Sequence, residues 1–217
     1  MASELHKGIV EIKKEVAEMA RLALSMLEDS VTSLINIDVN LANKVMDRKN
    51  LLRDMDDKIE ATGLRLIALY QPMAIDLRRL AAALKINTYL TRIGRYGKDI
   101  ALVVIQNIST DPVNIKLVNL THIWEHVRSM ISDAIEAYEK EDISLISNFT
   151  ERDNEVDKLR WSIFRECVTY MMENAKNITY FAHLQMIARY LERCGDHACK
   201  MAEKIYYMVK GTHIEIS

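Results

Sequence analysis

Residues 184–208 read LQMIARYLERCGDHACKMAEKIYYM, and their apolar residues recur at alternating spacings of three and four. The series is Leu184, Ile187, Leu191, Cys194, Ala198, Met201, Ile205 and Met208. This spacing places one apolar stripe along an α-helix and is typical of helices that pack in bundles. The stretch therefore predicts one long helix of a helical bundle.

The same apolar pattern occurs 101 residues earlier, in ALKINTYLTRIGRYGKDIALVVIQN at 83–107, and both stretches contain Tyr-Leu-x-Arg-x-Gly. A second match, shifted by 104, relates INIDVNLANKVMDR at 35–48 to EKEDISLISNFTER at 139–152. The change of offset indicates that about one turn was gained or lost in the second helix. We interpret the chain as two copies of one helical unit rather than two unrelated hairpins, and the unit is too long for a solenoid motif.

The breaks in the pattern predict six helices in an all-α chain. Only 6 Gly and 2 Pro occur in 217 residues, which disfavours a sheet-rich fold with many tight turns. Asp38, Asp142, Thr179 and the pair Asp111-Pro112 suit helix starts, and Gly211 suits a helix end. The expected helices are 4–36, 39–70, 73–106, 113–140, 143–175 and 180–210. We expect two tandem three-helix bundles related by an internal pseudo-repeat, with domains at 1–108 and 113–217.

Charge and hydropathy exclude several classes of protein. The 29 basic and 31 acidic residues nearly cancel, which disfavours nucleic acid as a partner. The longest apolar stretches fall short of the roughly 20 residues that cross a bilayer, and the start does not resemble a signal peptide. Three cysteines without a CxxC pair suggest neither a disulfide framework nor a zinc knuckle. We expect a protein of the reducing cytoplasm.

Two pairs of acidic residues form a candidate metal site. Glu192 and Asp196 are four apart on one face of the last helix, at positions that point away from its apolar stripe. Asp153 and Asp157 repeat this spacing on the preceding helix, which a short connection makes an antiparallel neighbour. Four carboxylates would then converge on a hard, oxygen-preferring cation such as magnesium, manganese, calcium or iron, with zinc also compatible. Glu203, two turns further on, would extend the stripe.

An alternative without any ion is open at this point. Arg160, Arg189 and Arg193 are near enough in the sequence to satisfy the same carboxylates by ordinary ion pairs. His197, beside Asp196, fits a solvated position on a polar face better than a metal ligand. The chain has no Walker loop, HExxH, Gly-x-Ser-x-Gly or dinucleotide fingerprint, and no nucleophile with a base. We therefore expect no enzymatic activity.

Two stretches resemble the signatures of a known family. LERCGDHACKMAEKIYYMVKG at 191–211 and QPMAIDLRRLAAALKINTYLTRIGRYGKDIA at 71–101 are similar to the second and first repeats of the PhoU family of phosphate-transport accessory proteins. The resemblance implies two three-helix bundles that dimerise and bind metal through carboxylate-x-x-x-Asp motifs on the bundle surface. It also implies a cytoplasmic regulator that transmits the state of a phosphate ABC transporter to a sensor kinase and restrains phosphate uptake and phosphate-starvation genes.

The first repeat departs from the family pattern. Thr91 and Arg95 stand where the family has carboxylates. The shift of 101 places Leu52 where the second repeat has its first aspartate, and only Asp56 keeps the second one. We expect the N-terminal bundle to have lost its metal site, or Arg95 to pair with Asp54 or Asp56.

These observations favour one function over two others. The favoured function is a non-enzymatic regulator of phosphate uptake and phosphate-starvation signalling. It would bind a divalent or trivalent metal ion (Fe, Mn, Mg, Zn or Ca), form a homodimer, and link the transporter's ATPase to a sensor kinase or other regulator. The transporter would bring it to the membrane peripherally. The alternatives are a metal-dependent hydrolase that handles phosphate and a structural helical dimer without an ion.

Overall fold

The protein is all-α in the computed structural model, which describes residues 2–110 and 118–216. The helices of the first half are α1 (Ala2–Asn36), α2 (Val39–Asp47), α3 (Lys49–Tyr70) and α4 (Ala74–Val103), which ends in a π-helical turn, η1 (Val104–Ile108). Those of the second half are α5 (Val118–Lys140), the 3-10 turn η2 (Ile143–Ile146), α6 (Phe149–Glu173), the 3-10 turn η3 (Ala175–Asn177) and α7 (Ile178–Lys210). None of these described helices combines the length and apolarity needed to span a bilayer.

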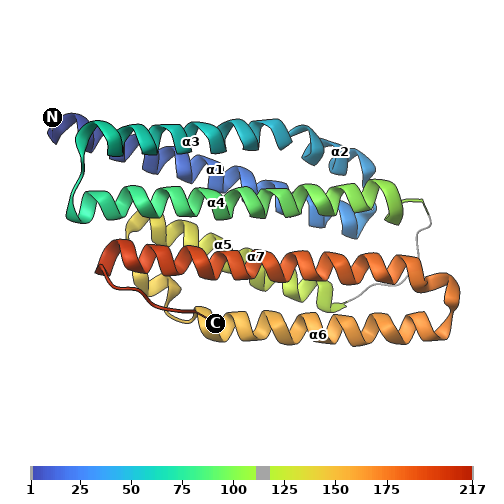
Figure 1. Cartoon of the computed structure of the whole chain (residues 1–217). Helices are drawn as coiled ribbons and strands as arrows, with labels where there is room; N and C mark the ends of the chain where they lie inside the picture. Colours follow the sequence, from blue (N-terminus) through green and yellow to red (C-terminus); the bar gives the residue numbers. More distant parts are fainter. Residues whose placement is uncertain (1, 111–117, 217) are drawn as a thin grey trace.

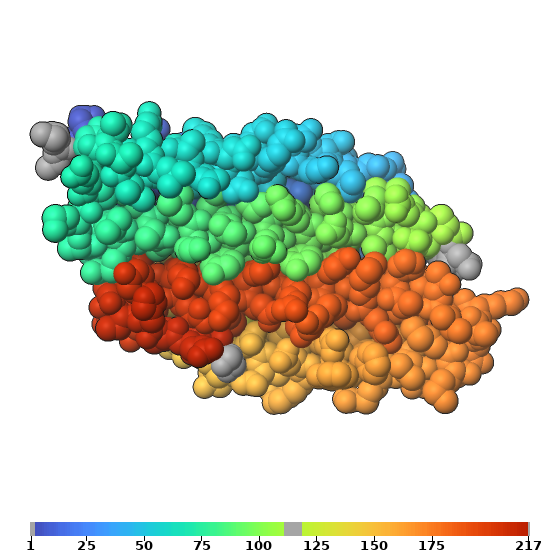
Figure 2. All heavy atoms as spheres, viewed as in Figure 1, coloured from blue at the N-terminus to red at the C-terminus, as the bar shows by residue number. Residues whose placement is uncertain are grey.

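The helices form two bundles that lie side by side. Helices α1, α3 and α4 make one layer and α5, α6 and α7 the other, with α4 and α7 running along their shared boundary (Figure 1). Helix α4 packs on α1 and α3, and α7 packs on α5 and α6, as the apolar pattern predicts. Figure 2 shows the two layers in contact along their length. The prediction of tandem three-helix bundles is confirmed.

Several predicted helix boundaries are confirmed. Asp38 caps α2, where its side chain accepts a hydrogen bond from the Leu41 amide at 3.0 Å. Asp142 caps η2 in the same way through the Ser144 amide, at 2.9 Å. Gly211 ends α7 with a left-handed φ of 77°, a conformation that glycine adopts without a Cβ penalty. The predicted start at Asp111 and Pro112 lies outside the described residues.

Other boundaries were predicted wrongly. The helix expected over 39–70 divides at Arg48, whose amide bonds to the carbonyls of Val45 and Met46 and whose guanidinium binds Asp29 of α1. The helix expected from 143 begins as η2 and becomes α-helical only at Phe149. Thr179 lies inside α7, because the side chain of Asn174 accepts from the Lys176 amide and starts the helical path earlier, at η3. These breaks depend on side-chain contacts that helical periodicity does not report.

The turn after the first helix of each bundle shows the internal repeat directly. Ile37 and Glu141, 104 residues apart, both adopt a positive φ, of 52° and 54°. The amides of the residues that follow, Asp38 and Asp142, bond back to the carbonyls of Ser33 and Ala137 at 2.8 and 3.1 Å. The equivalent ion pairs of Arg48 with Asp29 and of Arg152 with Asp133 keep the offset of 104, so the change of offset lies after Arg48 in the first bundle and after Arg152 in the second.

Polar contacts link the two bundles at the turn that contains Glu141. Its carboxylate accepts hydrogen bonds from Lys13 of α1 and from Arg79 of α4, each at 3.0 Å. Further along, Arg21 of α1 binds Glu139 of α5, also at 3.0 Å. The second bundle is thus held to both helices of the first that face it.

Gly97 sets the separation between α1 and α4. A Cβ added there would lie 2.9 Å from the amide nitrogen of Leu27 and 3.0 Å from the carbonyl of Met26. Both contacts are to backbone atoms, so no side chain can move aside to relieve them. Gly97 is therefore required for the close approach of the two helices.

The substitution Gly97→Ala is expected to lower the free energy of unfolding by about 1–3 kcal/mol, because α1 and α4 must move apart. Urea unfolding followed by circular dichroism measures this change.

Gly195→Ala is the matched control in α7. A Cβ at Gly195 would meet nothing nearer than Val156 Cγ1 at 3.6 Å. Alanine also favours a helix over glycine by about 1 kcal/mol, so this variant is expected to be as stable as the wild type or more so. Equal loss of stability in both variants would contradict the close-approach argument.

Candidate functional site

The antiparallel pair α6 and α7 brings the four predicted carboxylates into one neighbourhood. Asp153 and Asp157 come from α6, and Glu192 and Asp196 come from α7. Burial raises the pKa of Asp153 above its ordinary range, and the negative charges of Asp196, Asp157 and Glu192 raise it further. The two pairs therefore lie near enough for their charges to act on one another.

Asp153 lies at the centre of this cluster. Its Oδ1 atom is 3.9 Å from the position that a Cβ of Gly195 would take, so the glycine leaves the space beside the carboxylate open. The buried thiol of Cys199 lies beside Asp153 and lowers the carboxylate's pKa, which only partly offsets the effect of burial. Cys199 was not predicted to belong to the site, although its place one turn after Asp196 puts it on the same helix face.

Glu192 is buried, and the prediction that it points outward is wrong. Only 8% of the residue is exposed, because α6 covers this face of α7. Its Oε2 atom lies 3.2 Å from Nε of Arg160 on α6, and its Oε1 atom accepts a hydrogen bond from Arg189 on its own helix. Glu192 thus joins the two helices through an arginine.

Arginines form ion pairs with both carboxylates of α7. Asp196 binds Arg193 at 2.9 Å, so the ion pairs expected in the alternative without a metal are formed at Glu192 and Asp196, the two carboxylates of α7. Across residues 2–110 and 118–216, no three His, Cys, Asp or Glu side chains converge closely enough to hold a metal ion in this arrangement. A cation at this site must therefore displace one or more arginine contacts.

The donor set nevertheless fits a hard cation. The half-buried Asp153 carboxylate makes no ion pair in the described part of the chain, the charges of three further carboxylates act on it, and the space beside Gly195 is open. Carboxylate oxygens suit magnesium, manganese, calcium and iron, whereas the thiol of Cys199 would add affinity for zinc or iron. The residues present are therefore compatible with the predicted ions.

Two neighbouring residues have roles that the sequence did not predict. Glu203 does not extend the carboxylate stripe, because its Oε1 atom accepts from the Ile216 amide at 3.1 Å and from Lys200 at 2.7 Å. It fixes the C-terminal tail against α7. His197 is not solvated but packs between Tyr89 and Tyr96 of α4, at ring separations of 5.8 and 6.0 Å. Burial lowers the pKa of His197 to about 4, so the ring is neutral at pH 7.

The equivalent position in the first bundle has no carboxylate cluster. Leu52 fills the space beside Gly94, where its Cδ2 atom would lie 2.5 Å from an added Cβ. This contact establishes Leu52 as the counterpart of the aspartate beside Gly195. Asp56 accepts a hydrogen bond from Asn87 at 2.6 Å, and Arg95 makes no ion pair within the described ranges. The predicted pairing of Arg95 with Asp54 or Asp56 is wrong.

Comparison with protein families and known proteins gives one consistent result. The PhoU domain family matches residues 16–104 and 120–205. A phosphate-specific transport system accessory protein PhoU homolog of Rhizobium meliloti is 37% identical over 201 residues, which are 92% of this chain and 84% of the relative. The protein of the same description from Caulobacter vibrioides is 34% identical over 206 residues, 95% of this chain and 90% of the relative.

Solved structures agree with these relatives. The crystal structure of PhoU from Pseudomonas aeruginosa superposes with a TM-score of 0.91 at 30% identity, covering 95% of this chain and 99% of that one. The phosphate transport system regulatory protein PhoU from Streptococcus pneumoniae gives a TM-score of 0.88 at 20% identity, covering 97% and 99%. The second match concerns the fold alone.

The raised pKa of Asp153 predicts how the stability of the metal-free protein depends on pH. The Asp153 carboxyl binds its proton more tightly in the folded protein than in the unfolded chain. The free energy of unfolding therefore falls as pH rises from the ordinary aspartate pKa, about 3.9, through the raised pKa of Asp153. Asp153→Asn removes the ionisable group. We expect the variant to be more stable than the wild type at pH 7 and equally stable below about pH 4. Urea unfolding at several pH values, with a chelator present, measures the difference, and equal stability at pH 7 would contradict it.

Proposed function

Because the chain belongs to the PhoU family, we propose that it is an accessory regulator of phosphate uptake. The relatives that it matches over most of their length are described as accessory proteins of the phosphate-specific transport system. The two matched domains and the repeated turns at Ile37 and Glu141 support a complete pair of PhoU bundles in this chain. The observation that carries the proposal is this match over both bundles.

The proposed regulator acts without catalysing a reaction. Its partners are the ATPase of a phosphate ABC transporter and a sensor kinase or other signalling protein, and it functions as a homodimer on the cytoplasmic side of the membrane. Glu192 and Asp196 pair with arginines, and Asp153 lies beside the thiol of Cys199. These side chains therefore do not form a pair of general acid and general base. No observation favours the alternative of a phosphate-handling hydrolase.

The proposal includes a metal ion held by Asp153, Asp157, Glu192 and Asp196. When bound, the ion would supply positive charge that links α6 to α7 in place of the arginine contacts. Asp153 supports this role, since it is the carboxylate whose ionised form most needs a counter-charge. The ion pairs of Arg160, Arg189 and Arg193 support the competing structural alternative, in which no ion binds.

Metal binding distinguishes these alternatives. Purified protein, stripped with a chelator and re-equilibrated with manganese, iron, magnesium, zinc or calcium, is expected to retain at least one of these ions in elemental analysis. Asp153→Asn and Asp196→Asn are each expected to weaken binding by about tenfold or more, because each removes a ligand charge.

Glu155→Gln is the matched control, because Glu155 is an exposed acid of α6 that pairs with Lys158 away from the cluster. It is expected to bind metal as the wild type does. The same metal content in the wild type, Asp153→Asn, Asp196→Asn and Glu155→Gln would exclude the proposed ligands.

The regulatory role is tested in a bacterium whose own PhoU protein has been deleted. Expression of this chain is expected to reduce the uptake of radiolabelled phosphate by cells grown in excess phosphate, because the regulator restrains the transporter. An empty vector is the control. The cells also express the phosphate transporter from the same organism as this chain, and accumulation of the folded protein is verified. Unchanged phosphate uptake in these cells would contradict the proposed function.

A further inference from the structure

A cationic cavity lies in the N-terminal bundle where the C-terminal bundle has its carboxylates. It has a volume of about 250 Å³ and lies between α3 and α4. Its floor is apolar, and its walls carry four cations and no acid. The lining residues are Met26, Lys49, Leu52, Arg53, Thr91, Gly94, Arg95 and Lys98.

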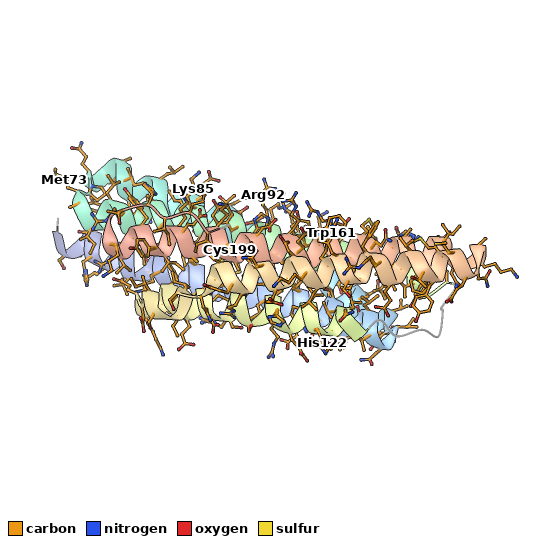
Figure 3. All side chains as sticks on the ribbon, turned by 90° about the horizontal axis from the view of Figure 1, so that it is seen from below. Met73, Lys85, Arg92, His122, Trp161 and Cys199 are labelled. Atoms are coloured by element: carbon orange, nitrogen blue, oxygen red, sulfur yellow. The ribbon has the colours of Figure 1, made fainter. Side chains whose placement is uncertain are left out.

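A second cavity continues the first along the same two helices. Its volume is about 410 Å³, and it shares Thr91 and Arg95 with the first. It adds the cations Lys85 and Arg92, which Figure 3 shows along one edge of the molecule, opposite His122. Asp56 and Glu60 line its other wall. Together the cavities form one groove that is strongly cationic at the end near Lys49.

The charges at this end are incompletely balanced. Arg53 approaches Asp54 at 3.4 Å and Lys98 approaches Asp99 at 2.7 Å, which offsets two of the four cations. Lys49 and Arg95 make no ion pair in the described ranges. Like charges gathered around one small volume repel each other, and a bound anion reverses this cost.

Two buried polar residues line the groove. Asn87 is only 2% exposed and Thr91 is 5% exposed. The Asn87 amide nitrogen donates to Asp56 at 2.6 Å, which fixes the orientation of the side chain and leaves its Oδ1 atom buried without a hydrogen-bond partner. An unpaired buried acceptor costs about 1–3 kcal/mol, and rotation of the Asn87 side chain toward the groove would let a bound ligand remove that cost.

The charge density of the cavity indicates the kind of anion. Arginine and lysine bind both carboxylates and phosphates. Four cations around about 250 Å³ match a ligand with several negative charges in a small volume, which a chain of phosphates supplies. A small di- or tricarboxylate carries fewer charges over a similar volume. The groove therefore fits phosphate better than carboxylate.

We propose that this groove binds a phosphate-bearing small anion, with its phosphates between Lys49, Arg53, Arg95 and Lys98. The ligand is inorganic triphosphate or the triphosphate chain of a nucleotide. A nucleotide would extend into the second cavity, where the carboxylates of Asp56 and Glu60 accept hydrogen bonds from its donor groups. This inference does not depend on the proposed regulatory function or on a metal ion.

Isothermal titration calorimetry on the full chain tests the proposal. The probes are tripolyphosphate, ATP and citrate, at one ionic strength and without divalent cations, so that metal bridging at the carboxylates of the other bundle does not contribute. Tripolyphosphate is expected to bind, with an affinity that falls as salt rises. Citrate is expected to bind at least about tenfold more weakly, because it carries fewer charges. Tighter binding of ATP than of tripolyphosphate identifies a nucleotide as the ligand, and equal or weaker binding identifies the inorganic form.

Matched variants locate the site. Arg95→Gln is expected to weaken tripolyphosphate binding by about tenfold, because it removes a charge-assisted contact. Arg65→Gln removes the same charge from an exposed position of α3 that lines neither cavity, and it is expected to change the affinity less than about twofold. No binding of either phosphate compound, equal binding of citrate, or equal effects of the two variants would each overturn the proposal. The phosphate-uptake experiment tests the regulatory function separately, so failure of the anion proposal leaves the regulatory proposal unaffected.

Discussion

The contact between α4 and α7 is the constraint on which the rest of the structure depends. Each of these helices packs against two helices of its own bundle and against the other across the boundary. Few positions on either helix therefore remain in water. Polar side chains that fall on the covered faces are held by specific partners, as His197 is between two tyrosines and Glu192 is between two arginines. Burial by the neighbouring helices, and not residue type alone, decides which partners these polar side chains bind.

Duplication gave the two bundles one backbone plan and left the side chains around one glycine free to differ. Gly94 and Gly195 occupy equivalent places, but Leu52 fills the space beside the first and Asp153 lies beside the second. A leucine there closes the position to a cation and gives the neighbouring cavity an apolar floor. An aspartate there creates a half-buried negative charge. One substitution in a shared frame thus changes the ion that the position suits.

Electrostatic imbalance is the property that both candidate sites share. In the C-terminal bundle, Asp153 lies among other carboxylates, and arginines neutralise Glu192 and Asp196. In the N-terminal bundle, Arg95 and Lys49 face the same cavity. A half-buried carboxylate among like charges, such as Asp153, lowers stability, whereas the exposed cations Lys49 and Arg95 repel each other only weakly in water.

The sequence by itself determined the helical class, the internal repeat, the family and the pairing of the acidic residues across two helices. The family follows from the resemblance of residues 71–101 and 191–211 to known signatures, and the other features follow from periodicity and spacing, which are local or repeat along the chain. Only the tertiary structure decided that Glu192 is buried, that Cys199 joins Asp153, that Glu203 holds the C-terminal tail and that Arg95 lines a cavity instead of pairing with an acid. Each of these depends on which face a neighbouring helix covers, and helical periodicity does not carry that information.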